Sequence, residues 1–141
     1  MKIAIVDDED RCLDEIERRV KEFFSAKNAP VEMSGYTSGK ARLAVLAEEK
    51  RYDVYFLDVE MTELDGLELA RRIRGFQKDA RIVLVTSFPR YMMDGYRVHA
   101  YYFILKSDCQ TEIPEVLEMI WSDAQAEEEG QTEDSYIIQN Y

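Results

Sequence analysis

The sequence contains only two cysteines, Cys12 and Cys109, and they do not share a spacing typical of a metal site. Two such cysteines cannot form the disulfide framework of a small secreted domain, so we expect reduced thiols and a cytoplasmic location. Long hydrophobic runs are also missing, since the apolar run at the N-terminus covers only residues 3–6 before a block of acids. A signal peptide or a membrane-spanning helix needs a longer run, so we expect neither of them and no membrane partner.

Basic residues are absent after Lys106. Residues 107–141 carry ten acidic side chains, whereas residues 1–106 carry 19 acidic and 18 basic ones. Almost all of the formal net charge of −11 therefore lies in the last quarter of the chain. This balance argues against a nucleic-acid surface within these residues. With 141 residues, 46% of them hydrophobic, the chain has the size of one domain with an ordinary core and is too short for a two-domain enzyme.

Short apolar segments, rich in β-branched or aromatic residues, alternate with segments of helical periodicity. The apolar segments predict strands at 3–6, 31–36, 54–57, 82–85 and 101–105. The periodic segments predict helices at 9–25, 38–50, 66–74, 89–97 and 110–126. Continuously apolar strands are typical of a parallel sheet that is covered on both faces. The alternation therefore predicts an α/β fold with a doubly wound parallel sheet.

The end of the chain differs from the rest. Residues 126–135 are polar and acidic, which predicts the end of the last helix and a linker. Residues 135–141, SYIIQNY, regain strand-forming side chains, and they are either the start of a further domain or a tail. We therefore divide the chain into a domain at 1–125 and a linker segment at 126–141.

Polar side chains follow the predicted strands at the sheet edge where open α/β folds bind their ligands. They are Asp7 and Asp8 after the first strand, Asp58 after the third, Thr86 after the fourth and Lys106 after the fifth. Each residue alone has an ordinary interpretation, because acids and hydroxyls are common where helices begin. All of them together at one edge indicate a functional site.

The chemistry of this set is that of phosphoryl transfer. Crowded carboxylates repel one another unless a cation lies between them. Mg²⁺ prefers oxygen ligands and commonly binds one or two carboxylates together with phosphate oxygens. A carboxylate beside Mg²⁺ can attack phosphorus and form an acyl phosphate. The phosphoryl oxygens would then need partners such as the Thr86 hydroxyl and the Lys106 ammonium group.

The motifs IAIVDDE, VYFLDVEM, LDGLELARRIR, RIVLVTS and AYYFILK resemble those of the receiver domain of two-component response regulators. The resemblance covers about residues 2–125. It implies a flavodoxin-like fold, with a five-stranded parallel sheet in the order 2-1-3-4-5 and five flanking helices. It further implies that Asp58 accepts a phosphoryl group from a cognate sensor histidine kinase. Such a domain is a signalling module and not an enzyme, apart from catalysing its own phosphorylation and dephosphorylation.

The resemblance also implies a Mg²⁺ site. Its ligands would be the carboxylates of Asp7, Asp8 and Asp58 and the backbone carbonyl of Glu60.

Three further residues match family positions. Thr86 matches the switch hydroxyl, Phe103 the switch aromatic and Lys106 the lysine that contacts the phosphoryl group. The usual proline after this lysine, which follows a cis peptide bond, is replaced by Ser107. A cis bond before a non-proline residue costs about 2.5–4 kcal/mol, so we expect a trans or strained linkage here. Phe103 lacks the hydroxyl of the more usual tyrosine.

The stretch TSFPRYMMDGYRVHAYYFILK at 86–106 resembles receivers that precede a LytTR-type DNA-binding domain. The expected output is transcription regulation, with DNA bound only through a C-terminal domain that this sequence lacks. Phosphorylation would change the face formed by the fourth helix, the fifth strand and the fifth helix. A homodimer could form there by setting basic residues against acidic ones. The residues concerned are Arg90, Arg97, Glu112, Glu115 and Glu118.

Three alternatives remain open. One is a stand-alone receiver that regulates a protein partner. A second is a receiver that is never phosphorylated and acts only as a binding module. The third is a small HAD-type phosphohydrolase, because VYFLDVEMT resembles a strand followed by D-x-D-x-T, with Asp58 as nucleophile and Glu60 as acid/base. That third alternative leaves Asp7 and Asp8 without a role.

Overall fold

The computed structural model describes residues 1–37, 41, 51–62 and 65–137, the last seven of these by their backbone alone. Its strands are β1 (Lys2–Val6), β2 (Glu32–Tyr36), β3 (Val54–Asp58), β4 (Arg81–Thr86) and β5 (Tyr102–Leu105). Its helices are α1 (Asp10–Ala26), α3 (Gly66–Phe76), α4 (Met92–Arg97) and α5 (Cys109–Ile137), with short 3-10 turns η1 (Pro89–Tyr91) and η2 (Lys106–Asp108). The helix expected at 38–50 lies outside the described residues, Ala41 apart.

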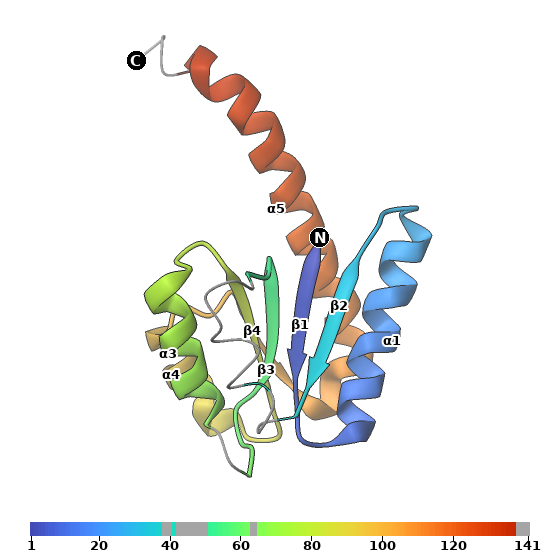
Figure 1. Ribbon diagram of the computed structural model, residues 1–141, viewed down its shortest axis with the longest axis vertical. Helices are drawn as coiled ribbons and strands as arrows, with labels where there is room; N and C mark the ends of the chain where they lie inside the picture. Colours follow the sequence, from blue (N-terminus) through green and yellow to red (C-terminus); the bar gives the residue numbers. More distant parts are fainter. Residues whose placement is uncertain (38–40, 42–50, 63–64, 138–141) are drawn as a thin grey trace.

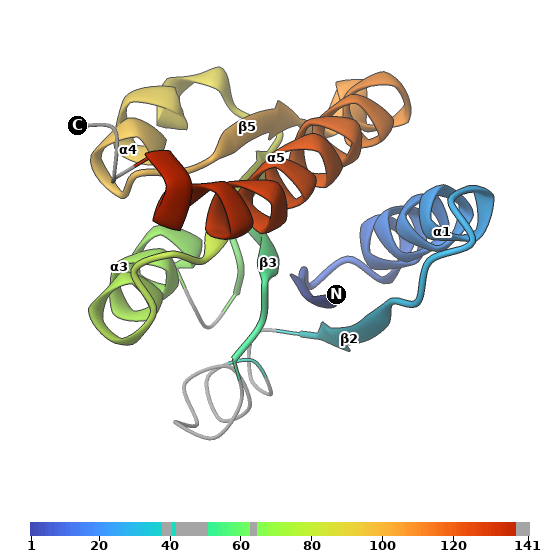
Figure 2. The same ribbon diagram turned by 90° about the horizontal axis from the view of Figure 1, so that it is seen from above.

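The strands form one parallel sheet in the order β2-β1-β3-β4-β5, as predicted (Figure 1). Figure 2 shows α1 and α5 over one face of the sheet and α3 and α4 over the other. Alternate residues of β1 therefore enter different cores: Ile3 and Ile5 pack with α1 and α5, whereas Ala4 and Val6 pack with α3. Burial on both faces explains why these strands are apolar throughout.

Helix α3 begins immediately beside the end of β3. Asp65 caps it by accepting a hydrogen bond from the backbone N–H of Leu67 at 2.8 Å. The next residue, Gly66, has no room for a side chain, because a Cβ atom there would lie 2.0 Å from the carbonyl oxygen of Asp58. This close approach fixes the loop that follows Asp58.

Helix α5 corrects one prediction about the end of the chain. The segment 126–135, expected as a linker, and residues 135–137, expected as strand-like, continue the helix to Ile137. Ala, Gln and Glu are strong helix formers, so a polar composition here is compatible with a helix as well as with a linker. The division between 1–125 and 126–141 remains a prediction. Within the described residues, none of the helices has the length and apolar character needed to cross a membrane.

Candidate phosphoryl-transfer site

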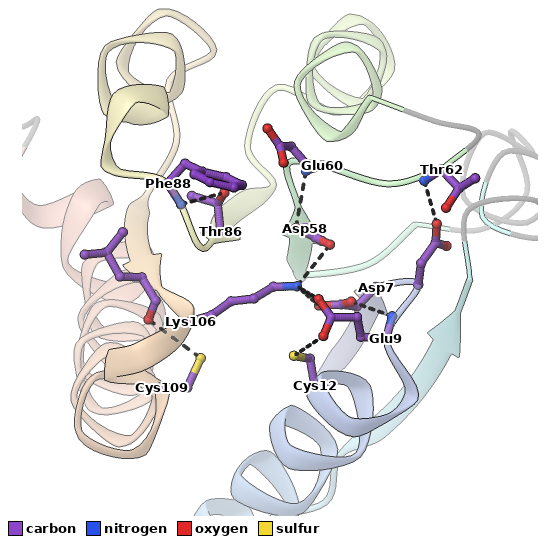
Figure 3. Close-up of polar contacts among 12 residues, drawn as sticks. Asp7, Glu9, Cys12, Asp58, Glu60, Thr62, Thr86, Phe88, Lys106 and Cys109 are labelled. Atoms are coloured by element: carbon purple, nitrogen blue, oxygen red, sulfur yellow. Dashed lines mark hydrogen bonds and ion pairs between the residues drawn. The ribbon is translucent and has the colours of Figure 1, made fainter.

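The structure brings Asp7, Asp58 and Lys106 together at the carboxyl ends of β1, β3 and β5 (Figure 3). The Lys106 Nζ atom lies 3.3 Å from Asp7 Oδ2 and 3.2 Å from Asp58 Oδ2. The two carboxylates are buried, with 0% of Asp7 and 4% of Asp58 exposed. One ammonium group therefore bridges two buried acids, and the predicted convergence of these three residues is what the structure shows.

Lys106 has a third acidic partner, Glu9. The sequence alone assigned no role to Glu9. Its Oε1 atom accepts a hydrogen bond from Lys106 Nζ at 2.9 Å. This bond lowers the pKa of Glu9. Burial of the Lys106 ammonium by itself lowers its pKa, but the bond to Glu9 and the two aspartates raise that pKa overall. The only sequence signal for Glu9 is its place next to the Asp7-Asp8 pair.

The buried carboxylates carry an excess of negative charge. Burial is the main cause that raises the pKa of Asp58 to about 7, and the neighbouring Asp7 adds to it. Lys106 and the backbone N–H of Glu60, which donates to Asp58 Oδ1 at 3.3 Å, act in the opposite direction. The pKa of Asp7 is also raised by burial. A single ammonium group thus leaves these two acids incompletely neutralised.

The donor set fits a hard divalent cation. Within the described part of the chain, Asp7 Oδ2 is buried without a hydrogen-bond partner, and it forms an ion pair with Lys106. Asp8 lies at the rim, where its Oδ2 atom accepts a hydrogen bond from the backbone N–H of Thr62 at 2.7 Å. Oxygen ligands of this kind suit Mg²⁺. The residues that would hold it are Asp7, Asp8, Asp58 and the backbone carbonyl of Glu60.

Another set of ligand atoms lies beside this one. Side-chain atoms of Asp7, Glu9 and Cys12 lie within 4.8 Å of one another. A thiol is a soft ligand, and burial raises the pKa of the Cys12 thiol, so Cys12 is a poor partner for Mg²⁺. The acidic cluster therefore supports a site for a hard cation that uses carboxylates and not the thiol.

The two expected switch residues lie on the β4–β5 side of the site. Thr86 is fully buried, and its hydroxyl accepts a hydrogen bond from the backbone N–H of Phe88 at 3.3 Å. Phe103 is half-buried and pairs with Leu84 in the β4–β5 register, next to Gly95 of α4. Phe103 therefore packs beneath α4 and not among the acids. The linkage between Lys106 and Ser107 is trans.

Comparison with known proteins assigns the family. A model of the response regulator receiver domain matches residues 3–118. The transcriptional regulatory protein YpdB of Escherichia coli K12 is 27% identical over 120 residues, which cover 85% of this chain and 47% of YpdB. The sensory transduction protein LytT of Enterococcus faecalis is 25% identical over 118 residues, covering 84% of this chain and 47% of LytT. The chain therefore spans about half the length of these relatives.

A solved response regulator has a similar fold. The response regulator protein TrrA of Thermotoga maritima, crystallised in complex with Mg²⁺ and BeF, is 28% identical, with a TM-score of 0.69. The match covers 84% of this chain and 96% of TrrA. These findings favour the receiver interpretation over the phosphohydrolase alternative. The chain belongs to the response regulator receiver domain family, and it is the receiver domain of a two-component signalling protein.

Proposed function

We propose that this domain is phosphorylated on Asp58 by a cognate sensor histidine kinase, with Mg²⁺ as cofactor. The observation that carries the proposal is the buried Asp58 carboxylate, which lies 3.2 Å from the Lys106 ammonium group and beside a second buried acid. The relative TrrA was crystallised in complex with Mg²⁺ and BeF, and this similarity supports the binding of Mg²⁺ and a phosphoryl-like ligand by this chain.

Each step uses a group of this chain. An Asp58 carboxylate oxygen attacks phosphorus and forms an acyl phosphate, while the bond from phosphorus to the donor breaks and its electron pair leaves with the donor. Lys106 offsets the charge of the phosphoryl oxygens from its place between Asp58 and Asp7. Bound Mg²⁺ would supply the remaining positive charge that the carboxylates and phosphoryl oxygens need. Attack by water on the acyl phosphate then releases inorganic phosphate and returns the free Asp58 carboxylate, so the full cycle consumes the phosphodonor and one water molecule.

The switch residues would couple the phosphoryl group to the surface. Thr86 would turn its hydroxyl from the Phe88 N–H toward a phosphoryl oxygen, and Phe103, which already packs beneath α4, would move further inward. The face made by α4, β5 and α5 would change with them. A phosphorylation-dependent homodimer would form through this face by setting Arg97 of one copy against Glu112 and Glu115 of the other. Arg90 and Glu118 are already paired within the chain, with Glu60 and Lys27.

The output that we propose is transcription regulation. YpdB is named a transcriptional regulatory protein, and both YpdB and LytT are about twice as long as the segment that matches. A LytTR-type DNA-binding domain after the linker at 126–141 would supply the DNA contact, and the location would be the cytoplasm. A stand-alone receiver that acts on a protein partner remains the alternative.

Incubation with acetyl phosphate and Mg²⁺, followed by intact-mass measurement, tests the proposal. We expect one phosphoryl group to be added to the wild-type chain and none to be added to Asp58→Ala. The matched control is Asp53→Ala, which lies just before β3, far from the site end of the strand, and should be modified like the wild type. Absence of the adduct from the wild type would support the alternative in which the domain acts only as a binding module.

A further inference from the structure

A second polar cluster lies at the mouth of the site and joins two loops. Glu60 follows β3 by two residues, whereas Arg90 and Tyr91 belong to η1, which follows β4. Arg90 Nη2 donates a hydrogen bond to Glu60 Oε1 at 3.0 Å, and the Tyr91 hydroxyl donates to the same oxygen. Arg90 Nη2 also donates to the Tyr91 hydroxyl at 3.2 Å. One carboxylate oxygen therefore accepts bonds from two side chains of the opposite loop.

Aromatic contacts hold the arginine of this cluster in place. The Arg90 guanidinium carbon lies 4.4 Å from the centre of the Phe88 ring and 4.9 Å from that of Tyr91. The two rings meet edge to face, with their centres 6.3 Å apart. Cation–π contacts of this kind stabilise an exposed arginine in one orientation. The cluster thus adds hydrogen bonds and cation–π contacts to its ion pair, whereas an isolated surface ion pair contributes little by itself.

The same two loops carry the groups that the proposed reaction uses. On one side, the backbone N–H of Glu60 donates to Asp58 Oδ1 at 3.3 Å. On the other side, the Phe88 N–H donates to the Thr86 hydroxyl at 3.3 Å, as Figure 3 shows. In the part of the chain that the structure describes, no hydrogen bond joins Thr86 to Asp58. The turn from Thr86 to Tyr91 is therefore tied to Glu60 while the threonine hydroxyl is bonded to the Phe88 N–H.

We propose that Arg90 and Tyr91 are positioning residues that act through Glu60. They hold the turn at 86–91 in the conformation described here, and so oppose the movement of Thr86 toward a phosphoryl group on Asp58. The inference rests on the proposed function. A contact that exists only in the unphosphorylated conformation favours that conformation by some factor. The apparent affinity for a ligand that binds the alternative conformation is lowered by the same factor. Loss of the contact should therefore tighten binding of a phosphoryl analogue.

The test is calorimetric titration of the full chain with beryllofluoride at saturating Mg²⁺, at protein concentrations where the chain stays monomeric. Tyr91→Phe removes the hydroxyl but keeps the ring and the charge of the site. We expect it to bind beryllofluoride roughly three- to tenfold more tightly than the wild type, the range of one ordinary net hydrogen bond, because the Glu60 carboxylate is partly exposed and keeps its bond from Arg90. Arg90→Lys, which keeps the charge but loses the planar fork, should change the affinity in the same direction by a smaller factor.

Matched controls separate this effect from a general destabilisation of the fold. Tyr96→Phe removes a hydroxyl from an exposed ring of α4, and Arg72→Lys alters an exposed arginine of α3 that pairs with Glu68. Both should bind like the wild type.

A second background tests whether the effect passes through Glu60. In Glu60→Ala the acceptor is gone, so adding Tyr91→Phe should leave the beryllofluoride affinity unchanged. The lifetime of the phosphorylated protein should follow the same pattern, because a turn that closes more readily protects the acyl phosphate.

Two results would overturn the inference. Either Tyr91→Phe binds beryllofluoride no more tightly than the wild type, or it has the same effect in the Glu60→Ala background. Failure of the proposed function looks different, because the wild type itself would then bind no beryllofluoride and form no adduct with acetyl phosphate. That result would overturn this inference together with the proposal on which it rests.

Discussion

Replacing Asp58 by asparagine should stabilise the domain in the absence of Mg²⁺. The Asp58 carboxylate is 4% exposed and lies beside buried Asp7, so its ionised form is disfavoured in the folded state. Asparagine has nearly the same shape and keeps an oxygen that can accept a hydrogen bond from Lys106. The substitution therefore removes a buried charge at little steric cost.

The size of the effect follows from the pKa of Asp58, which rises from 3.8 in the unfolded chain to about 7 in the fold. A change of this size corresponds to ~4 kcal/mol. We expect a gain of about 2–3 kcal/mol, because the asparagine amide must also be buried. A raised carboxyl pKa lowers the stability of the wild type as the pH rises through the range between the two pKa values. The advantage of Asp58→Asn should thus be near zero around pH 4 and complete above about pH 7.

Urea denaturation in EDTA at several pH values between these limits measures this advantage directly. The control is Asp53→Asn, just before β3, where the side chain is exposed and an asparagine oxygen can still accept the hydrogen bond from the Lys2 N–H, so we expect little change. Addition of Mg²⁺ should stabilise the wild type more than Asp58→Asn, because a cation offsets the buried charge only where that charge exists. If Asp58→Asn were less stable than the wild type at neutral pH, or if its advantage did not depend on pH, the electrostatic account of the site would be refuted.

Three further predictions concern other residues of the site. Lys106→Met leaves the buried acids without their ammonium partner and should lower the free energy of unfolding by roughly 1–3 kcal/mol at neutral pH. Adding Asp58→Asn should recover most of this loss, as measured by urea denaturation. Gly66→Ala places a Cβ atom 2.0 Å from the Asp58 carbonyl and should markedly lower the thermal unfolding temperature. Gly75→Ala is the control in the same helix, because an added Cβ atom there would have no neighbour within 4 Å, and it should be neutral or stabilising by up to about 1 kcal/mol. An equal drop of the unfolding temperature in both variants would contradict this reasoning. Thr86→Val keeps the shape but loses the hydroxyl, so calorimetry should show weaker beryllofluoride binding, whereas unchanged binding would argue against a switch role.

The strand positions and the principal site were predictable because they depend on local sequence, whereas the strand order was implied only by the resemblance to receiver domains. Strands buried on both faces are apolar throughout, so β1, β3 and β4 stand out as short hydrophobic runs. The residue after each run lies at the ligand-binding edge wherever the sheet is parallel. For this reason Asp7, Asp58 and Lys106 could be placed together without coordinates.

The contacts that the sequence did not reveal depend on the paths of loops and on side-chain orientation. Glu60 and Arg90 are 30 positions apart, and nothing in either segment shows that one carboxylate oxygen will accept from both Arg90 and Tyr91. The role of Glu9 could not be predicted for the same reason, because its hydrogen bond to Lys106 joins residues 97 positions apart. The extent of α5 escaped prediction for another reason, since its polar composition suits both a helix and a linker.

The central claim is that Asp58 is the phosphoacceptor, and chemical trapping tests it most directly. The protein is treated with acetyl phosphate and Mg²⁺, reduced with borohydride, which converts an aspartyl phosphate to homoserine, and sequenced by tandem mass spectrometry. The account predicts homoserine at position 58 alone, with none in a sample that received no phosphodonor. Homoserine at position 7 or 8, or none anywhere in a sample whose intact mass shows the phosphoryl adduct, would contradict it.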